Sequence, residues 1–138
     1  MKIMICGSMS FAREMIQAKE ALEGMGHEVL VTSDVEECVG NPGLNMDLEH
    51  CQSKNIDKEC FDKIEESDAI LVMNYPKDGI DGYVGGATLM EIGVARHLNK
   101  RIFLLHNLPS EGKQRYAFEI LLTNPVVLNG RIDRICQT

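Results

Sequence analysis

The sequence predicts an α/β domain built on a doubly wound, five-stranded parallel sheet. Five short β-rich runs alternate with stretches that have helical apolar spacing, a pattern typical of parallel strands joined by helical crossovers. The chain has 138 residues, of which 44% are hydrophobic and 25% are charged. These values fit one globular domain, which we assign to residues 1–138.

The first half of the chain predicts a strand, a helix and a second strand. Lys2–Cys6 is short and apolar, as expected for a buried strand. Apolar residues then recur every three or four positions, which predicts a helix with Ser10 as its N-cap and Gly24 near its end. His27–Thr32 is β-rich. Residues 33–56 have turn chemistry and no clear period, so we expect a long, partly ordered loop there.

The second half continues the alternation of helix and strand. The strongest strand of the chain lies here and is followed by a glycine-rich loop. The complete pattern favours the strand order 2-1-3-4-5, a flavodoxin-like three-layer sandwich. The predicted elements are a helix over Ile56–Glu66, a strand over Asp68–Met73, a helix over Val84–Asn99, a strand over Arg101–Leu105, a helix over Lys113–Leu122 and a strand over Val126–Leu128.

Composition and charge exclude several classes of partner. Asp and Glu total 21 against 14 Lys and Arg, so the net charge is −7 and the chain is repelled by polymeric nucleic acid and anionic membranes. No apolar run is long enough to span a bilayer or act as a secretory signal, which predicts a cytoplasmic protein. Five cysteines without C-x-x-C spacing favour reduced thiols over disulfides or a metal site.

In an open parallel sheet, ligands bind beyond the carboxyl ends of the strands. This rule selects residues that follow the first, third and fourth predicted strands. We interpret His27, His50 and His97 as structural or solvated residues. The selected residues are Gly7, Ser8, Met9 and Ser10, then Asn74, Tyr75 and residues 78–86, then His106 and Asn107.

Glu91 interrupts the apolar stripe of the helix predicted over Val84–Asn99. It is the only charged residue between Asp81 and Arg96. A carboxylate at a core position costs on the order of several kcal/mol unless it is paired, hydrogen-bonded or protonated. The alternatives are a structural hydrogen bond or a functional carboxylate, and the nearby helix start at Gly85-Gly86, which faces the predicted ligand crevice, favours function.

The loop after the first strand, Cys6–Ser10, runs directly into a helix and offers backbone N–H groups and two hydroxyls, which suits a phosphate. It lacks the G-x-G-x-x-G pattern, which disfavours a dinucleotide. A phosphatase loop of the C-x5-R kind is also disfavoured, because six residues separate Cys6 from Arg13. A tight turn without a ligand is the structural alternative.

Four stretches together resemble a known family. They are Cys6–Ser8 after the first strand, Ser67–Val72 in the third, Met90–Ala95 around the lone carboxylate, and Lys100–Leu105 in the fourth strand. In this order they resemble the nucleoside 2-deoxyribosyltransferases and, more closely, the 2′-deoxynucleoside 5′-phosphate N-hydrolases. The resemblance covers most of the chain.

The resemblance implies cleavage or exchange of the N-glycosidic bond of a deoxynucleoside or its 5′-monophosphate, without a cofactor or metal. It places Glu91 on the family's nucleophile, which attacks the anomeric carbon through an oxocarbenium-like transition state. Gly7 and Ser8 fall on its substrate-cradling loop. The proton donor is left open: Asp57 and Glu59 lie near the family's acid, Asp78 and Asp81 are loop alternatives, and Cys60 is a candidate for the aligned position itself.

Family members complete each site with residues from a neighbouring subunit, which implies a homo-oligomer, dimer or larger, and makes Asn124 and Asn129 candidates. A non-catalytic nucleotide-binding or sensing module of the same fold is the alternative function. An FMN carrier is disfavoured, because the chain has no Trp and only three Tyr to stack a flavin. The remaining expected substrate-binding residues are Ser10, Asn74, Tyr75, Asp81, Gly85, Gly86 and Thr88.

Overall fold

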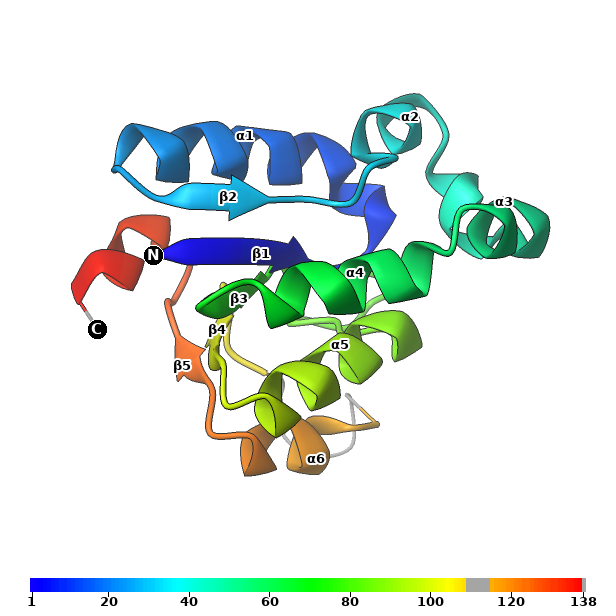
Figure 1. Ribbon diagram of the computed structural model, residues 1–138. Helices are drawn as coiled ribbons and strands as arrows, with labels where there is room; N and C mark the ends of the chain where they lie inside the picture. The colour runs from blue at the N-terminus through cyan, green and yellow to red at the C-terminus, as the bar shows by residue number, and fades with distance from the viewer. Residues whose placement is uncertain (109–114, 138) are drawn as a thin grey trace.

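The protein folds around a five-stranded sheet, shown in the computed structural model of Figure 1, which describes residues 1–108 and 115–137. All pairings are parallel, and the strand order is β2-β1-β3-β4-β5. The predicted architecture and order are therefore confirmed. The strands are β1 (Lys2–Cys6), β2 (Glu28–Leu30), β3 (Ala69–Val72), β4 (Arg101–Leu104) and β5 (Val126–Val127).

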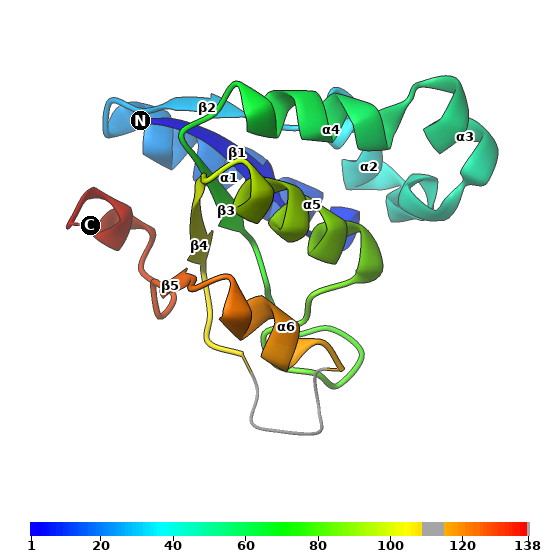
Figure 2. The ribbon, with the colours of Figure 1, turned by 60° about the horizontal axis from the view of Figure 1, so that its bottom comes forward.

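Helices cover both faces of the sheet, as Figures 1 and 2 show from two directions. One face packs against α1, α2 and η3, and the other packs against α4, α5 and α6. The helices are α1 (Ala12–Gly24), α2 (Val35–Gly40), α3 (Leu48–Ser53), α4 (Ile56–Glu65), α5 (Gly86–His97) and α6 (Ala117–Leu122), with short 3-10 helices η1 (Met9–Phe11), η2 (Pro42–Met46) and η3 (Ile132–Gln137).

The strands are buried on both faces because successive side chains point in opposite directions. In β1, Ile3 and Ile5 join the core on the α1 side, whereas Met4 and Cys6 join the core on the α4 and α5 side. Every residue of β3 is fully buried, since this strand lies at the centre of the sheet. The two cores hold the carboxyl ends of β1 and β3 side by side.

Residues 33–56 do not form the loop predicted for them. They contain α2, η2 and α3, which form the lobe at one end of the molecule in Figures 1 and 2. Val35 and Cys38 are buried in the core that contains α1, and Asp47 caps α3 by accepting a hydrogen bond from the backbone N–H of His50. The prediction was wrong because these helices have at most six residues and are stabilised by tertiary contacts.

The predicted start of the first helix is also corrected. Ser8, not Ser10, supplies the cap: its Oγ accepts a hydrogen bond from the backbone N–H of Ser10 at 3.3 Å and opens η1. Helix α1 then begins at Ala12 without a side-chain cap. Near the C-terminus α6 begins at Ala117, and the first two residues of the helix predicted over Lys113–Leu122 lie outside the described residues.

Across residues 1–108 and 115–137, no helix is long and apolar enough to cross a membrane.

Candidate active site

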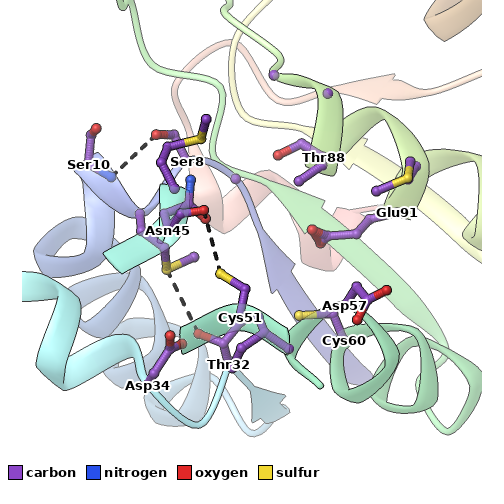
Figure 3. Close-up of a pocket in the computed structure, with 18 of the residues that line it drawn as sticks. Ser8, Ser10, Thr32, Asp34, Asn45, Cys51, Asp57, Cys60, Thr88 and Glu91 are labelled. Atoms are coloured by element: carbon purple, nitrogen blue, oxygen red, sulfur yellow. Dashed lines mark hydrogen bonds between the residues drawn. The ribbon is translucent and has the colours of Figure 1, made fainter. Parts of the chain in front are cut away.

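A cavity of about 460 Å³ opens beyond the carboxyl ends of β1 and β3, where the predicted crevice lies (Figure 3). Three parts of the chain form most of its walls. The first is the loop after β1, the second is the segment from Thr32 to Phe61, and the third is the start of α5 with Lys77 and Tyr83 before it.

Glu91 lies on the second turn of α5 and reaches into this cavity (Figure 3). The same helix buries Thr88, Ile92 and Ala95, so the carboxylate interrupts an otherwise apolar face. Burial raises the pKa of Glu91 to about 7, although a hydrogen bond with the Cys6 thiol opposes the rise. The cavity therefore holds a half-buried carboxyl group that ionises near neutral pH.

Two buried thiols flank Glu91. Cys6 ends β1 and hydrogen-bonds the carboxylate, and Cys60 of α4 lines the cavity. Burial and the nearby charge of Glu91 raise the pKa of both thiols well above the usual range. Both thiols therefore stay neutral, so Cys6 can donate its hydrogen bond to Glu91, and neither thiol releases a proton at neutral pH.

Gly7 lets the chain turn sharply from β1 into η1. Its φ is +146°, and an added Cβ would lie 3.0 Å from Met15 Cε and 3.1 Å from the backbone oxygen of Met73. Neither the backbone conformation nor the space suits another residue. The turn brings Gly7, Ser8 and Ser10 to the cavity wall.

Lys77 supplies positive charge beside this loop. Its Nζ donates a hydrogen bond to Ser8 Oγ at 3.0 Å and lies 5.3 Å from the centroid of the Tyr83 ring. Among the described residues that line the cavity, Lys77 is the only Lys, Arg or His. An anionic group of a ligand would therefore be placed here, next to the backbone N–H groups of the loop.

The N-terminus of α5 forms the adjoining part of the wall. Gly85 precedes the helix and provides no side-chain cap for its first N–H groups. An added Cβ at Gly86 would meet no atom within 4 Å, so this glycine leaves space for a ligand. Thr88, one turn before Glu91, is buried and lines the cavity beside the carboxylate (Figure 3).

The wall opposite Glu91 comes from the segment predicted to be a loop, and sequence reasoning missed it. Asp34 follows β2, is only 3% exposed, and accepts a hydrogen bond from His50 Nε2 at 2.9 Å. Thr32, Asn45 and Cys51 lie on the same side of the cavity (Figure 3). The rule that selects residues beyond strand ends could have found Thr32 and Asp34, because both lie within four residues of the end of β2.

The predicted proton donors are placed differently from one another. Asp57 lies on the first turn of α4 and lines the cavity near Cys60 (Figure 3). Glu59 faces elsewhere: it accepts hydrogen bonds from Ser33 at 2.7 Å and from Lys63 Nζ at 2.8 Å. These bonds lower the pKa of Glu59 although burial opposes the change. Glu59 therefore ties α4 to the end of β2.

Several predicted substrate-binding residues lie outside the cavity. Asn74 is fully buried and exchanges two hydrogen bonds with the backbone of His106, at 2.7 and 2.8 Å. Tyr75 packs between the rings of Phe11 and His106, with centroids 5.1 and 5.2 Å away. These two residues join β3 to neighbouring elements. Exposed predicted residues that do not line the cavity are Asp78, Asp81, Asn124 and Asn129.

Within the described part of the chain, no group of three or more His, Cys, Asp or Glu side chains is arranged to hold a metal ion. The five cysteines are free thiols.

No family model and no curated protein matches the sequence. The structure is similar to that of the CMP N-glycosidase BcmB of Clostridium botulinum, with a TM-score of 0.53 and 21% sequence identity. The match covers 99% of this chain and 95% of that chain. The likeness shows that the two proteins share a fold, which in this chain is a three-layer α/β sandwich with the strand order 2-1-3-4-5.

Proposed function

We propose that the protein cleaves the N-glycosidic bond of a nucleoside 5′-monophosphate, with Glu91 as the nucleophile. The observation that carries this proposal is the half-buried Glu91 carboxylate in a cavity whose only described cationic side chain, Lys77, lies beside the first loop. The fold shared with a CMP N-glycosidase supports it. Lys77 and Ser8 favour a 5′-phosphate over a 5′-hydroxyl, because an anion offsets the positive charge there.

The proposed reaction has two steps. An oxygen of ionised Glu91 forms a bond to the anomeric carbon, the bond to the base breaks, and the base leaves with the electron pair and takes up a proton. Water then attacks the same carbon, gives one proton to the group that protonated the base, and releases Glu91, so the products are the sugar phosphate and the free base. Of the two candidate acids on α4, only Asp57 lines the cavity, so we assign it as the proton donor.

The test is incubation of the protein with nucleosides and their 5′-monophosphates, in both ribose and deoxyribose forms. Chromatography should detect free base from at least one 5′-monophosphate, with an equal amount of sugar phosphate. Glu91→Gln should abolish release, whereas Glu20→Gln, an exposed position on α1, should leave it unchanged. A nucleotide with fluorine at C2′ of the sugar, which traps the intermediate, should add its fluorinated sugar phosphate to Glu91, as read by mass spectrometry.

A second candidate function is a nucleotide-binding module without catalysis. Cys60 favours this second function. The resemblance makes Cys60 a candidate for the position of the family's acid, and this neutral thiol cannot protonate a leaving base at neutral pH. Tight nucleotide binding without any base release would support this second function.

A further inference from the structure

Building on the proposed function, we infer that Asp34, held by His50, is the residue that selects the nucleobase, and that it favours a base with an exocyclic amino group. The bases of this class are cytosine, adenine and guanine. Their deaminated counterparts, uracil, hypoxanthine and xanthine, carry a carbonyl oxygen at the same position.

The position of the base follows from the other two parts of a nucleotide. The phosphate is assigned to Lys77 and the first loop, and the anomeric carbon must lie next to Glu91. An attacking oxygen and a leaving base lie on opposite sides of the carbon that they share. The base must therefore extend away from Glu91, toward the wall that contains Thr32, Asp34, Asn45 and Cys51 (Figure 3).

Asp34 is the only acidic residue of that wall among the described residues, and one of its oxygens is unused. Oδ2 accepts the hydrogen bond from His50 Nε2 at 2.9 Å, whereas Oδ1 is buried and makes no hydrogen bond of good geometry in the described part of the chain, although the Thr32 hydroxyl and the Cys38 thiol lie near the carboxylate. A buried acceptor without a donor is unfavourable, so a ligand that brings an N–H group here gains this contact.

An ionised carboxylate can only accept hydrogen bonds. Burial alone would raise the pKa of Asp34, but its polar contacts with His50 and Thr32 hold that pKa below the usual value, so the group is ionised at neutral pH. An amino group on the base therefore binds at Oδ1. A carbonyl oxygen at the same place is also a hydrogen-bond acceptor, so the ionised Oδ1 repels it.

Calorimetric titration of the Glu91→Gln variant, which should prevent turnover, tests the inference with CMP against UMP and with AMP against IMP. At least one amino-bearing nucleotide should bind about tenfold or more tightly than its deaminated counterpart, the size expected for one charge-assisted hydrogen bond. Adding Asp34→Asn should reverse the preference, because the His50 N–H fixes the amide oxygen and leaves the NH₂ group to face the base. Adding Glu36→Gln instead, at an exposed position of α2, should change neither ratio.

Equal affinities within both nucleotide pairs would overturn the inference, and so would an Asp34→Asn protein with an unchanged ratio. If Asp34→Asn fails to fold, the ratios measured with Asp34 in place still decide. Selective binding without base release by the unmodified protein would refute the proposed function and support the base subsite. Base release with equal affinities would support the proposed function and refute the base subsite.

Discussion

Replacing Glu91 by glutamine removes an ionisable group from the cavity wall at nearly constant volume. Burial raises the pKa of this carboxyl group from its ordinary value of 4.5 to about 7, and the Cys6 hydrogen bond offsets only part of that effect. The folded chain therefore holds this proton more tightly than the unfolded chain does. Ionisation of Glu91 opposes folding, so the glutamine variant should be more stable wherever Glu91 is ionised.

The sign and size of the effect depend on pH. Below about pH 4.5 the carboxyl group is protonated in both states and does not change the free energy of unfolding. Between pH 4.5 and about 7 only the unfolded chain releases the proton, so the free energy of unfolding falls as pH rises. Above about pH 7 Glu91 is ionised in both states, and the free energy of unfolding has been lowered by the full amount. The rise in pKa corresponds to about 3 kcal/mol. Because Glu91 is partly accessible to water, we expect a gain of about 1–3 kcal/mol for Glu91→Gln.

Urea unfolding of both proteins at about pH 4.5, 6 and 8 measures this difference. The other carboxyl groups titrate in both proteins, so their contributions cancel when the free energies of unfolding are subtracted. The difference should be close to zero at the lowest pH and reach its full value at the highest. Glu20→Gln, exposed on α1, should show no such dependence.

Two results would refute the reasoning. A difference that does not change with pH would mean that Glu91 has the same pKa in both states. A glutamine variant less stable than the parent at pH 8 would mean that the carboxylate is held in a stabilising ionic interaction, as a structural residue would be.

Cys6→Ala removes the hydrogen bond that lowers the pKa of Glu91, so this pKa should rise above about 7. The acidic limb of the kcat/KM profile for base release should then move to higher pH. Gly82→Ala should lower the free energy of unfolding by about 1–3 kcal/mol more than Gly79→Ala does. Both glycines have positive φ, but a Cβ at Gly82 meets a backbone carbonyl oxygen and one at Gly79 meets no atom within 4 Å. Lys77→Met should reduce kcat/KM for a 5′-monophosphate by about tenfold or more and leave that for the nucleoside nearly unchanged.

Controls separate these effects from general damage. Cys38→Ala removes a buried thiol that does not line the cavity and should leave the pH profile in place. Lys58→Met removes an exposed lysine that pairs with Asp62 on α4 and should not alter the choice of substrate. A parallel loss of nucleoside and nucleotide activity in Lys77→Met would argue against phosphate recognition by Lys77. Equal unfolding energies for the two glycine variants would show that the backbone near Gly82 relaxes.

Sequence reasoning found one side of the cavity. Glu91 stands out because a single charge interrupts an apolar helical stripe, and Gly7 and Ser8 follow a buried strand directly. Both are local patterns, so the residues that make them are close together in the chain. Asn74 and Tyr75 satisfy the same rule about strand ends, yet their side chains join β3 to its neighbours instead of lining the cavity.

Sequence alone determined the strands, their parallel order and the carboxylate at the cavity. The apolar runs of strands and the apolar spacing of helices are patterns among residues that lie close together in the chain. Only the tertiary structure decided how residues 33–56 fold and what they contribute. Their helices are too short to form without packing, and their contacts join distant positions: His50 meets Asp34 16 residues away. Elsewhere in the cavity wall, Lys77 reaches Ser8 across 69 residues. Such pairs leave no periodic pattern, since they exist only once the sheet has brought the loops together.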